Sequence, residues 1–152
     1  MRSLFLLLLF LLFSNYSFEC TTAVISGKAT KDGRPLLWKH RDTESFNNKM
    51  VFFKGRVYNF VGLVNSQDDR KEVWGGTNSE GFSIINSASY NLKPLDDKTE
   101  KMDQEGLMMY IALETCATVQ DFQNLLDTLK KPFGVESNFG IIDAHGGAAY
   151  FE

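Results

Sequence analysis

The side chains in this sequence best suited to chemistry are one cysteine and three charged residues that follow it. Cys20 opens an extended run, and Lys39, Arg41 and Asp42 close the next one. A thiolate is a strong nucleophile, and a nearby cation lowers the pKa of a cysteine thiol. If Cys20 begins the mature chain, its own α-amine has an unperturbed pKa of roughly 7.7–8 and can accept the thiol proton. Nucleophile and base then belong to one residue.

Acyl transfer from such a cysteine also needs a cation, a carboxylate and a hydrogen-bond donor. Arg41 or Lys39 can hold the thiolate, and Asp42 can orient the α-ammonium, as a third group orients the base in a triad. Lys39 and Asn78 are in addition candidates to contact the substrate. A side-chain amide is a suitable donor to the oxyanion of the tetrahedral intermediate. Three asparagines at turns or strand edges are candidates for this donor: Asn78, Asn86 and Asn138.

A hairpin is expected to bring the cysteine and the charged residues together. Thr21–Ser26 is rich in β-branched residues, Leu36–His40 is a second extended run, and Asp32-Gly33 between them is a turn signal. A reversal centred near this signal sets Cys20 roughly opposite Asp42 in an antiparallel pair. The sequence therefore predicts a local site built on two adjacent strands.

The first nineteen residues have the order of a secretory signal. Met1–Ser3 carries one positive charge, Leu4–Phe13 is an uninterrupted apolar run, and Ser14–Glu19 is a short polar segment. The apolar run is too short to span a bilayer, which takes about 20 residues. We expect residues 1–19 to be removed, which leaves a secreted or periplasmic protein without a stable membrane anchor. Lipidation of Cys20 is the alternative, although the two residues before it are larger than those usual at such sites.

Composition limits the class of protein. The chain has 152 residues, of which 43% are hydrophobic and 13% aromatic, so residues 20–152 suffice for one modest globular domain. A formal net charge of −3 without a basic stripe argues against a nucleic-acid partner. His40 and His145 are the only histidines, too few for a zinc site, and we expect neither metal nor cofactor. Cys116 lies in a helical pattern and is expected to be a reduced, buried small hydrophobe.

The elements after the hairpin change from strands to helices and back. Asp103–Cys116 has apolar residues at three- and four-residue spacing, which predicts a helix with one apolar stripe. Thr118 and Asp121 resemble a capping box that opens a second helix, which Pro132 ends. This order predicts an α+β fold with helices packed on an antiparallel sheet. The expected strands are Met50–Phe53, Val57–Val64, a strand that opens at Val73-Trp74 and stops at Gly75-Gly76, Phe82–Ser87, Asn138–Ile142 and Ala148–Phe151.

The residues that carry the chemistry resemble those of a known family. Cys20-Thr21-Thr22, the turn Gly27–Gly33 and the strand end Lys39–Asp42 look like the opening of N-terminal-nucleophile cysteine hydrolases. The nearest groups are the choloylglycine hydrolase/penicillin V acylase superfamily and its acyl-CoA:6-aminopenicillanate acyltransferase-like branch. Gly76–Phe82 is similar to the family's Asn-Glu-x-Gly-hydrophobic turn, and Asn138–Glu152 is similar to its next strand pair.

This resemblance implies an αββα fold, in which two stacked antiparallel sheets lie between helical layers. It also implies an enzyme that cleaves a linear amide C–N bond of a small molecule, with Cys20 as nucleophile and Asp42 as the amine-orienting aspartate. The family's arginine stands three residues before the aspartate, where this chain has Lys39. Alternate strand residues share a face, so Lys39 and Arg41 point one way and Asp42 the other unless the strand bulges. We expect Arg41 to serve as the cation.

Other interpretations fit the same residues. An N-terminal-nucleophile dipeptidase is the nearest rival, because such enzymes also begin Cys-Thr-Thr and continue through a Gly-Lys-x-Ala turn. A lipid-anchored binding protein and a truncated, non-catalytic relative are further alternatives. Truncation is expected because a strand that is cut at Glu152 without a polar tail leaves an unsatisfied edge.

Overall fold

Two antiparallel sheets and two α-helices make up the part of the chain that the computed structural model describes, residues 20–67, 71–89 and 103–152. The α+β class is confirmed, while the signal-like residues 1–19 lie outside the described part. The strands are β1 (Thr21–Ile25), β2 (Leu36–His40), β3 (Asn48–Phe53), β4 (Phe60–Asn65), β5 (Gly75–Asn78), β6 (Ser83–Ala88), β7 (Ser137–Ile142) and β8 (Ala148–Phe151). The helices are a short 3₁₀ turn, η1 (Gly27–Ala29), and the α-helices α2 (Glu105–Thr115) and α3 (Val119–Thr128).

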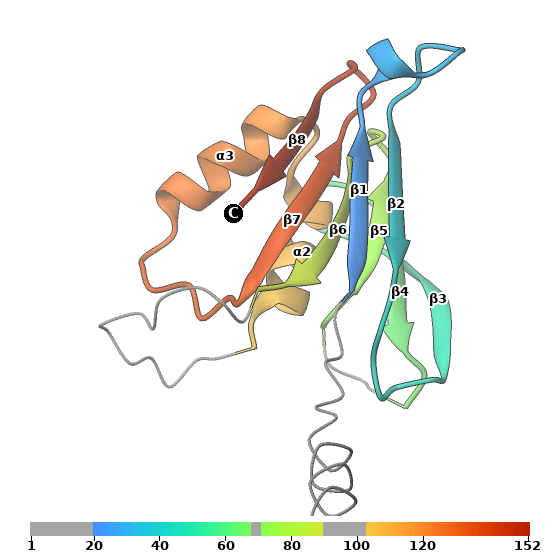
Figure 1. Cartoon of the computed structure of the whole chain (residues 1–152). Coiled ribbons are helices and arrows are strands. Elements are labelled where there is room, and N and C mark those ends of the chain that lie inside the picture. The colour runs from blue at the N-terminus through green and yellow to red at the C-terminus, as the bar shows by residue number, and fades with distance from the viewer. Residues whose placement is uncertain (1–19, 68–70, 90–102) are drawn as a thin grey trace, which may run out of the picture.

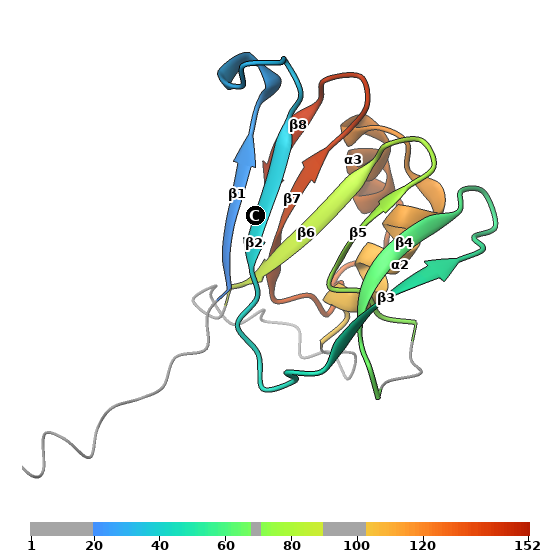
Figure 2. The same ribbon diagram turned by 90° about the vertical axis from the view of Figure 1, so that its right-hand side faces the viewer.

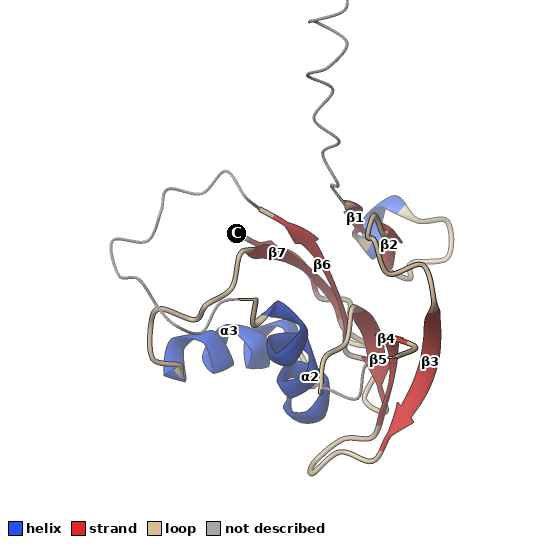
Figure 3. Ribbon diagram, turned by 90° about the horizontal axis from the view of Figure 1, so that it is seen from below, coloured by secondary structure: helices blue, strands red, loops and turns tan. Residues whose placement is uncertain are grey.

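These elements form three layers (Figure 1 and Figure 2). Strands β3 to β8 follow one another in a six-stranded sheet in which every neighbouring pair is antiparallel. Strands β1 and β2 form a separate hairpin that lies on one face of this sheet, against β6, β7 and β8. Helices α2 and α3 cover the opposite face (Figure 3). Side chains on the inner faces of the hairpin and the large sheet therefore face each other.

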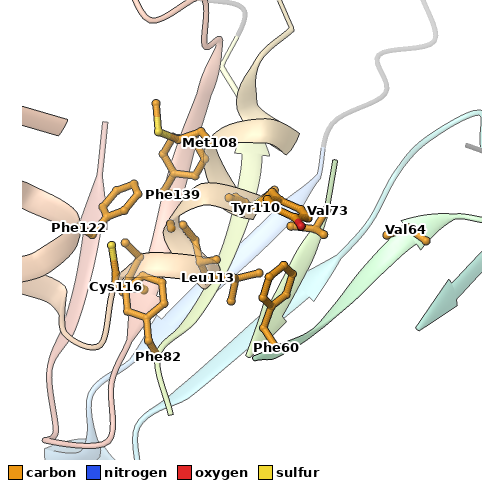
Figure 4. Close-up of a cluster of buried hydrophobic side chains, with 14 residues drawn as sticks. Phe60, Val64, Val73, Phe82, Met108, Tyr110, Leu113, Cys116, Phe122 and Phe139 are labelled. Carbon is orange, nitrogen blue, oxygen red and sulfur yellow. The ribbon is translucent and has the colours of Figure 1, made fainter. Parts of the chain in front are cut away.

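The hydrophobic core lies between the large sheet and the helices (Figure 4). Phe60 of β4 meets Tyr110 of α2 edge to face, with ring centroids 5.0 Å apart, and Phe122 of α3 meets Phe139 of β7 at 5.6 Å. Such aromatic pairs stabilise a core beyond the area that they bury. The core thus anchors the large sheet from the side that faces away from the hairpin.

Helix α2 differs from its prediction, because it is buried on nearly all sides rather than along one stripe. Its outer side is covered by loops as well as by the sheet and α3. Arg56 Nε donates to Glu114 Oε2 at 2.9 Å, and the backbone N–H of Tyr58 donates to the carbonyl of Glu114 at 3.1 Å. Tyr58 belongs to the predicted strand Val57–Val64, which accordingly begins only at Phe60.

The capping box of α3 is confirmed. The hydroxyl of Thr118 accepts from the backbone N–H of Asp121, and the carboxylate of Asp121 accepts from the N–H of Thr118. This reciprocal pair satisfies donors that the first turn of a helix leaves open. The local pattern therefore predicted this helix start, which also has a tertiary contact, since the N–H of Val119 donates to Asp143 Oδ2 at 2.9 Å.

Strand β5 begins where the sequence predicted that a strand would stop. A side chain at Gly76 would place its Cβ 2.6 Å from the carbonyl oxygen of Val61 and 2.8 Å from Leu113 Cδ1. The glycine is needed because β4 and α2 both approach the backbone of β5 at this point. Gly75-Gly76 looks like a turn in the sequence, but in the structure Gly76 lets β4 and α2 pack closely against β5.

The hairpin is shifted by one residue from its predicted register. Thr21 pairs with His40, so continuation of the ladder sets Cys20 opposite Arg41 rather than Asp42. The connection, residues 26–35, contains η1 as well as Gly33, whose φ of 75° is the positive value that the turn signal predicted. The reversal is therefore a wide loop and not a tight turn at Asp32-Gly33.

Candidate active site

Cys20 immediately precedes β1 and lines a cavity of about 680 Å³. Its Sγ lies 3.6 Å from the backbone carbonyl oxygen of Asp42 and can donate to it. The start of β1, the end of β6 and the start of β7 lie at the same end of the molecule (Figure 1). All three charged residues predicted around the thiol line this cavity. Other residues that line it include Asn65, Trp74, Asn86, Asp103, Glu105 and Ser137.

Lys39 extends from β2 to the large sheet. Its Nζ donates to the carbonyl oxygen of Trp74 at 2.9 Å and to Asn86 Oδ1 at 2.6 Å. The β5–β6 ladder ends at the pair Gly75 and Ile85, and Trp74 and Asn86 are the next residues beyond it. The ammonium of Lys39 therefore lies at the end of this ladder and bonds to both strands. Burial lowers the pKa of Lys39 to about 8; charge on Cys20 opposes the shift and the charge of Arg41 adds to it.

Arg41 is held differently, by contacts on both ends of its guanidinium and on its face. One terminal nitrogen donates to Asn48 Oδ1 and the other to Asn65 Oδ1, the latter at 2.8 Å. The guanidinium also lies over the ring of Trp74, 5.2 Å from the centroid. Burial lowers the pKa of Arg41, and charge on Cys20 raises it. Both cations are thus within electrostatic range of the thiol, but Arg41 is fixed by three partners.

Asp42 joins the same cavity because β2 ends at His40 and the chain then leaves the alternation of the strand. Its backbone carbonyl, not its carboxylate, meets the thiol of Cys20. Among the residues that the structure describes, no donor is bonded to the Asp42 carboxylate. That carboxylate therefore has room to accept an α-ammonium, which is the role that the sequence suggested and which stays a prediction.

Asn86 is the predicted asparagine that the structure brings to Cys20. Its Oδ1 accepts from Lys39, and its Nδ2 donates to Ser137 Oγ at 2.9 Å. Since an ammonium can only donate, the contact with Lys39 fixes which end of the amide is oxygen. One N–H of Asn86 remains without a partner among the described residues, and the side chain lines the cavity. Asn86 can therefore supply the oxyanion donor.

Asn78 lies elsewhere and has no donor to spare. Its Nδ2 donates to the carbonyl oxygens of Leu113 at 3.0 Å and Cys116 at 2.7 Å, while its Oδ1 accepts from the N–H groups of Glu80 and Phe82. The side chain is buried and lines neither cavity of the site. It joins the β5–β6 turn to the end of α2, so the geometry gives no support to a substrate contact.

Asn138 occupies an intermediate position. It pairs with Ser87 on the large sheet, and its Oδ1 is buried without a hydrogen-bond partner among the described residues. Its neighbour Ser137 lines the cavity, but Asn138 itself does not. The structure therefore places Asn138 beside the site and not in its wall.

Several residues of the site carry no signal in the sequence. Trp74 was assigned to a strand, and nothing in its spacing shows that its ring would meet Arg41. Glu105 begins α2 and lines the cavity, yet it stands far from Cys20 in the chain. Burial raises the pKa of Glu105, as do Asp103, Glu136 and Glu72. Its Oε2 is buried and lacks a hydrogen-bond partner among the described residues.

A second cavity of about 410 Å³ adjoins the first. Lys39, Arg41 and Trp74 line both, so these three residues stand at the boundary. The remaining walls of the second cavity come from the hairpin and from strands of the large sheet, and most are apolar. They include Leu37, Leu63, Ile85 and Ile142. An extended molecule can thus place an apolar part beside a polar, reactive centre.

The other cysteine does not take part. Cys20 and Cys116 are both free thiols, as predicted. Cys116 is 2% exposed, and burial raises the pKa of its thiol to about 11, so it stays protonated at neutral pH. Within residues 20–67, 71–89 and 103–152, no group of three His, Cys, Asp or Glu side chains is arranged to hold a metal.

No helix in the described ranges has the length and apolar character needed to cross a bilayer. No protein-family model matches the chain, and no curated protein matches it significantly.

Proposed function

We propose that the protein is an exported N-terminal-nucleophile cysteine hydrolase that cleaves a linear amide C–N bond. The observation that carries this proposal is one cavity shared by Cys20, two cations, a carboxylate and Asn86. The hairpin and the residues beside it supply Cys20, Lys39, Arg41 and Asp42. Asn86 comes from the large sheet. Two stacked antiparallel sheets with helices on one outer face agree with an αββα hydrolase.

The proposed reaction begins with removal of residues 1–19, which frees the α-amine of Cys20. This amine takes the thiol proton, and the resulting thiolate attacks the carbonyl carbon of the amide. Asp42 holds the α-ammonium, and Asn86 donates to the oxyanion. The C–N bond then breaks, which leaves an acyl group on Cys20 until water releases it as a carboxylic acid.

The second cavity favours an apolar acyl group on the substrate. It opens onto the boundary residues Lys39, Arg41 and Trp74, so an acyl chain placed there has its carbonyl near the reactive centre. A dipeptidase is the second candidate, because Asp103 and Glu105 also line the first cavity and could hold a substrate α-ammonium. Comparison of hexanoyl p-nitroanilide with unblocked dipeptides separates these two classes.

Cys20→Ala and Cys20→Ser test the proposed function directly. Both should abolish hydrolysis of hexanoyl p-nitroanilide, because alanine has no nucleophile and a serine hydroxyl is far less acidic than a thiol. Cys116→Ala is the matched control and should retain activity. N-terminal sequencing of the secreted protein should begin at Cys20. An active protein that retains residues before Cys20 would refute the proposal, because a peptide nitrogen cannot act as the base.

A further inference from the structure

The two cations beside Cys20 differ in what they can do with a proton. Arg41 keeps its charge at any pH that a protein tolerates, and Asn48, Asn65 and Trp74 fix its guanidinium. Lys39 carries an amine that can lose and regain a proton. The site therefore contains one permanent cation and one exchangeable cation.

The ammonium of Lys39 is positioned with one donor unused. An ammonium has three N–H bonds, and two of them are directed at the Trp74 carbonyl and Asn86 Oδ1. None of the described residues accepts the third. Because Lys39 lines both cavities, it stands where an acyl group in the apolar cavity would join a leaving group in the cavity of Cys20.

We propose that Lys39 is the general acid that protonates the leaving nitrogen when Cys20 cleaves the amide. This rests on the proposed function and adds a catalytic residue to it. Lys39, rather than the α-ammonium of Cys20, then acts on the leaving group. The α-ammonium can stay bound to Asp42 through the first half of the reaction.

The proton balance closes over one cycle. As the C–N bond breaks, Lys39 gives a proton to nitrogen and the amine departs neutral, which leaves an acyl-thioester and a neutral Lys39. Lys39 then takes a proton from water, whose oxygen attacks the thioester carbonyl. Collapse of that intermediate expels the Cys20 thiolate, which recovers its proton from the α-ammonium. One amide and one water give one carboxylic acid and one amine.

The charges around Lys39 suit this role. Cys20 and Arg41 interact with its charge, and the carboxyl groups that share its cavity are Asp42 and Glu44 after β2, Asp103 before α2 and Glu105 at the start of α2. Burial lowers the pKa of Lys39 to about 8, with the charge of Arg41 adding to the shift and charge on Cys20 opposing it. An amine with this pKa is mostly protonated at neutral pH and is a stronger acid than an ordinary lysine, which matches the need of a leaving amine.

Matched amide and ester substrates test the proposal, because only the amide nitrogen needs a proton to leave. The probes are hexanoyl p-nitroanilide and p-nitrophenyl hexanoate, which form the same acyl-enzyme. In the secreted protein, kcat/KM for the anilide should fall above about pH 8 as Lys39 loses its proton, and kcat/KM for the ester should not. This comparison needs no variant.

Lys39→Arg keeps a cation and donors to Trp74 and Asn86 but cannot act as an acid. It should lower kcat/KM for the anilide by about 10²–10⁴-fold, remove the alkaline limb and leave the ester within about threefold. Lys49→Arg, at an exposed lysine of β3, is the control and should change neither substrate. Equal loss with both substrates, or no loss with either, would overturn the assignment of Lys39 while leaving the proposed function intact. Activity that survives Cys20→Ala would overturn the proposed function itself.

Discussion

Asn86 has two proposed roles: it donates to the oxyanion and it accepts a hydrogen bond from Lys39. Asn86→Asp removes the first role and keeps the second. Aspartate keeps an oxygen where Asn86 Oδ1 accepts from Lys39, and the Ser137 hydroxyl can turn to donate to the other oxygen. Both N–H groups of the amide are lost. If the free N–H of Asn86 stabilises the tetrahedral intermediate, kcat should fall about 10²–10³-fold. The free energy of unfolding should change little, since a buried ion pair with Lys39 replaces a charged hydrogen bond.

Asn86→Ala gives the structural cost for comparison. It removes a hydrogen bond to an ammonium and one to Ser137, which together are worth about 2–4.5 kcal/mol of stability. Urea unfolding measures this loss, and hydrolysis of the hexanoyl anilide and ester measures the catalytic one. An oxyanion forms with both substrates, so Asn86→Asp should slow both, unlike Lys39→Arg, and the anilide should lose more because the new carboxylate raises the pKa of Lys39. Asn138→Ala is the control; if Asn86→Asp keeps near-normal rates while Asn138→Ala loses them, the assignment is refuted.

Two further predictions concern residues outside the reacting groups. Cys116→Ala should cost about 1 kcal/mol of stability with unchanged kcat. A thiol reagent should label only Cys20 in the folded protein, since the buried Cys116 thiol is protonated. Rapid labelling of Cys116 would contradict its burial. Gly76→Ala should destabilise the fold by about 1–3 kcal/mol or more, because its Cβ meets Val61 O and Leu113 Cδ1 at less than 3.0 Å. Thr77→Ala, at the next residue, is the control and should cost less. Equal urea midpoints for the two variants would count against this packing.

Local features were predictable because neighbours in the sequence determine them. The hairpin β1–β2, the capping box at Thr118 and the last two strands each depend on a few adjacent residues. The residues around Cys20 were predictable for the same reason, since one hairpin carries Lys39, Arg41 and Asp42. The register still differed by one residue, because the sequence does not show how η1 widens the loop.

Features that depend on packing were not predictable. Gly75-Gly76 has a turn composition, and only the approach of β4 and α2 makes these residues a strand. Asn78 and Asn86 look alike in sequence, as amides near strand ends. The first is saturated by α2 and its own turn, whereas the second meets Lys39 and the cavity. Which asparagine can donate to an oxyanion is decided by long-range contacts.

The contacts that assemble the site also dock the hairpin onto the large sheet. A two-stranded hairpin is marginal by itself in water, so β1 and β2 depend on the surface beneath them. Lys39 bridges to Trp74 and Asn86 there, and on the same side Tyr150 lies within hydrogen-bonding distance of Thr22 and Ser87. Loss of the Lys39 contacts is therefore expected to weaken docking of the hairpin on the large sheet and, at the same time, to displace Cys20. A drop in activity at Lys39 identifies chemistry only when the amide-to-ester ratio changes, because displacement of the hairpin slows both substrates alike. At Asn86, where an oxyanion donor serves both substrates, it identifies chemistry only when the rate falls without a matching loss of unfolding free energy.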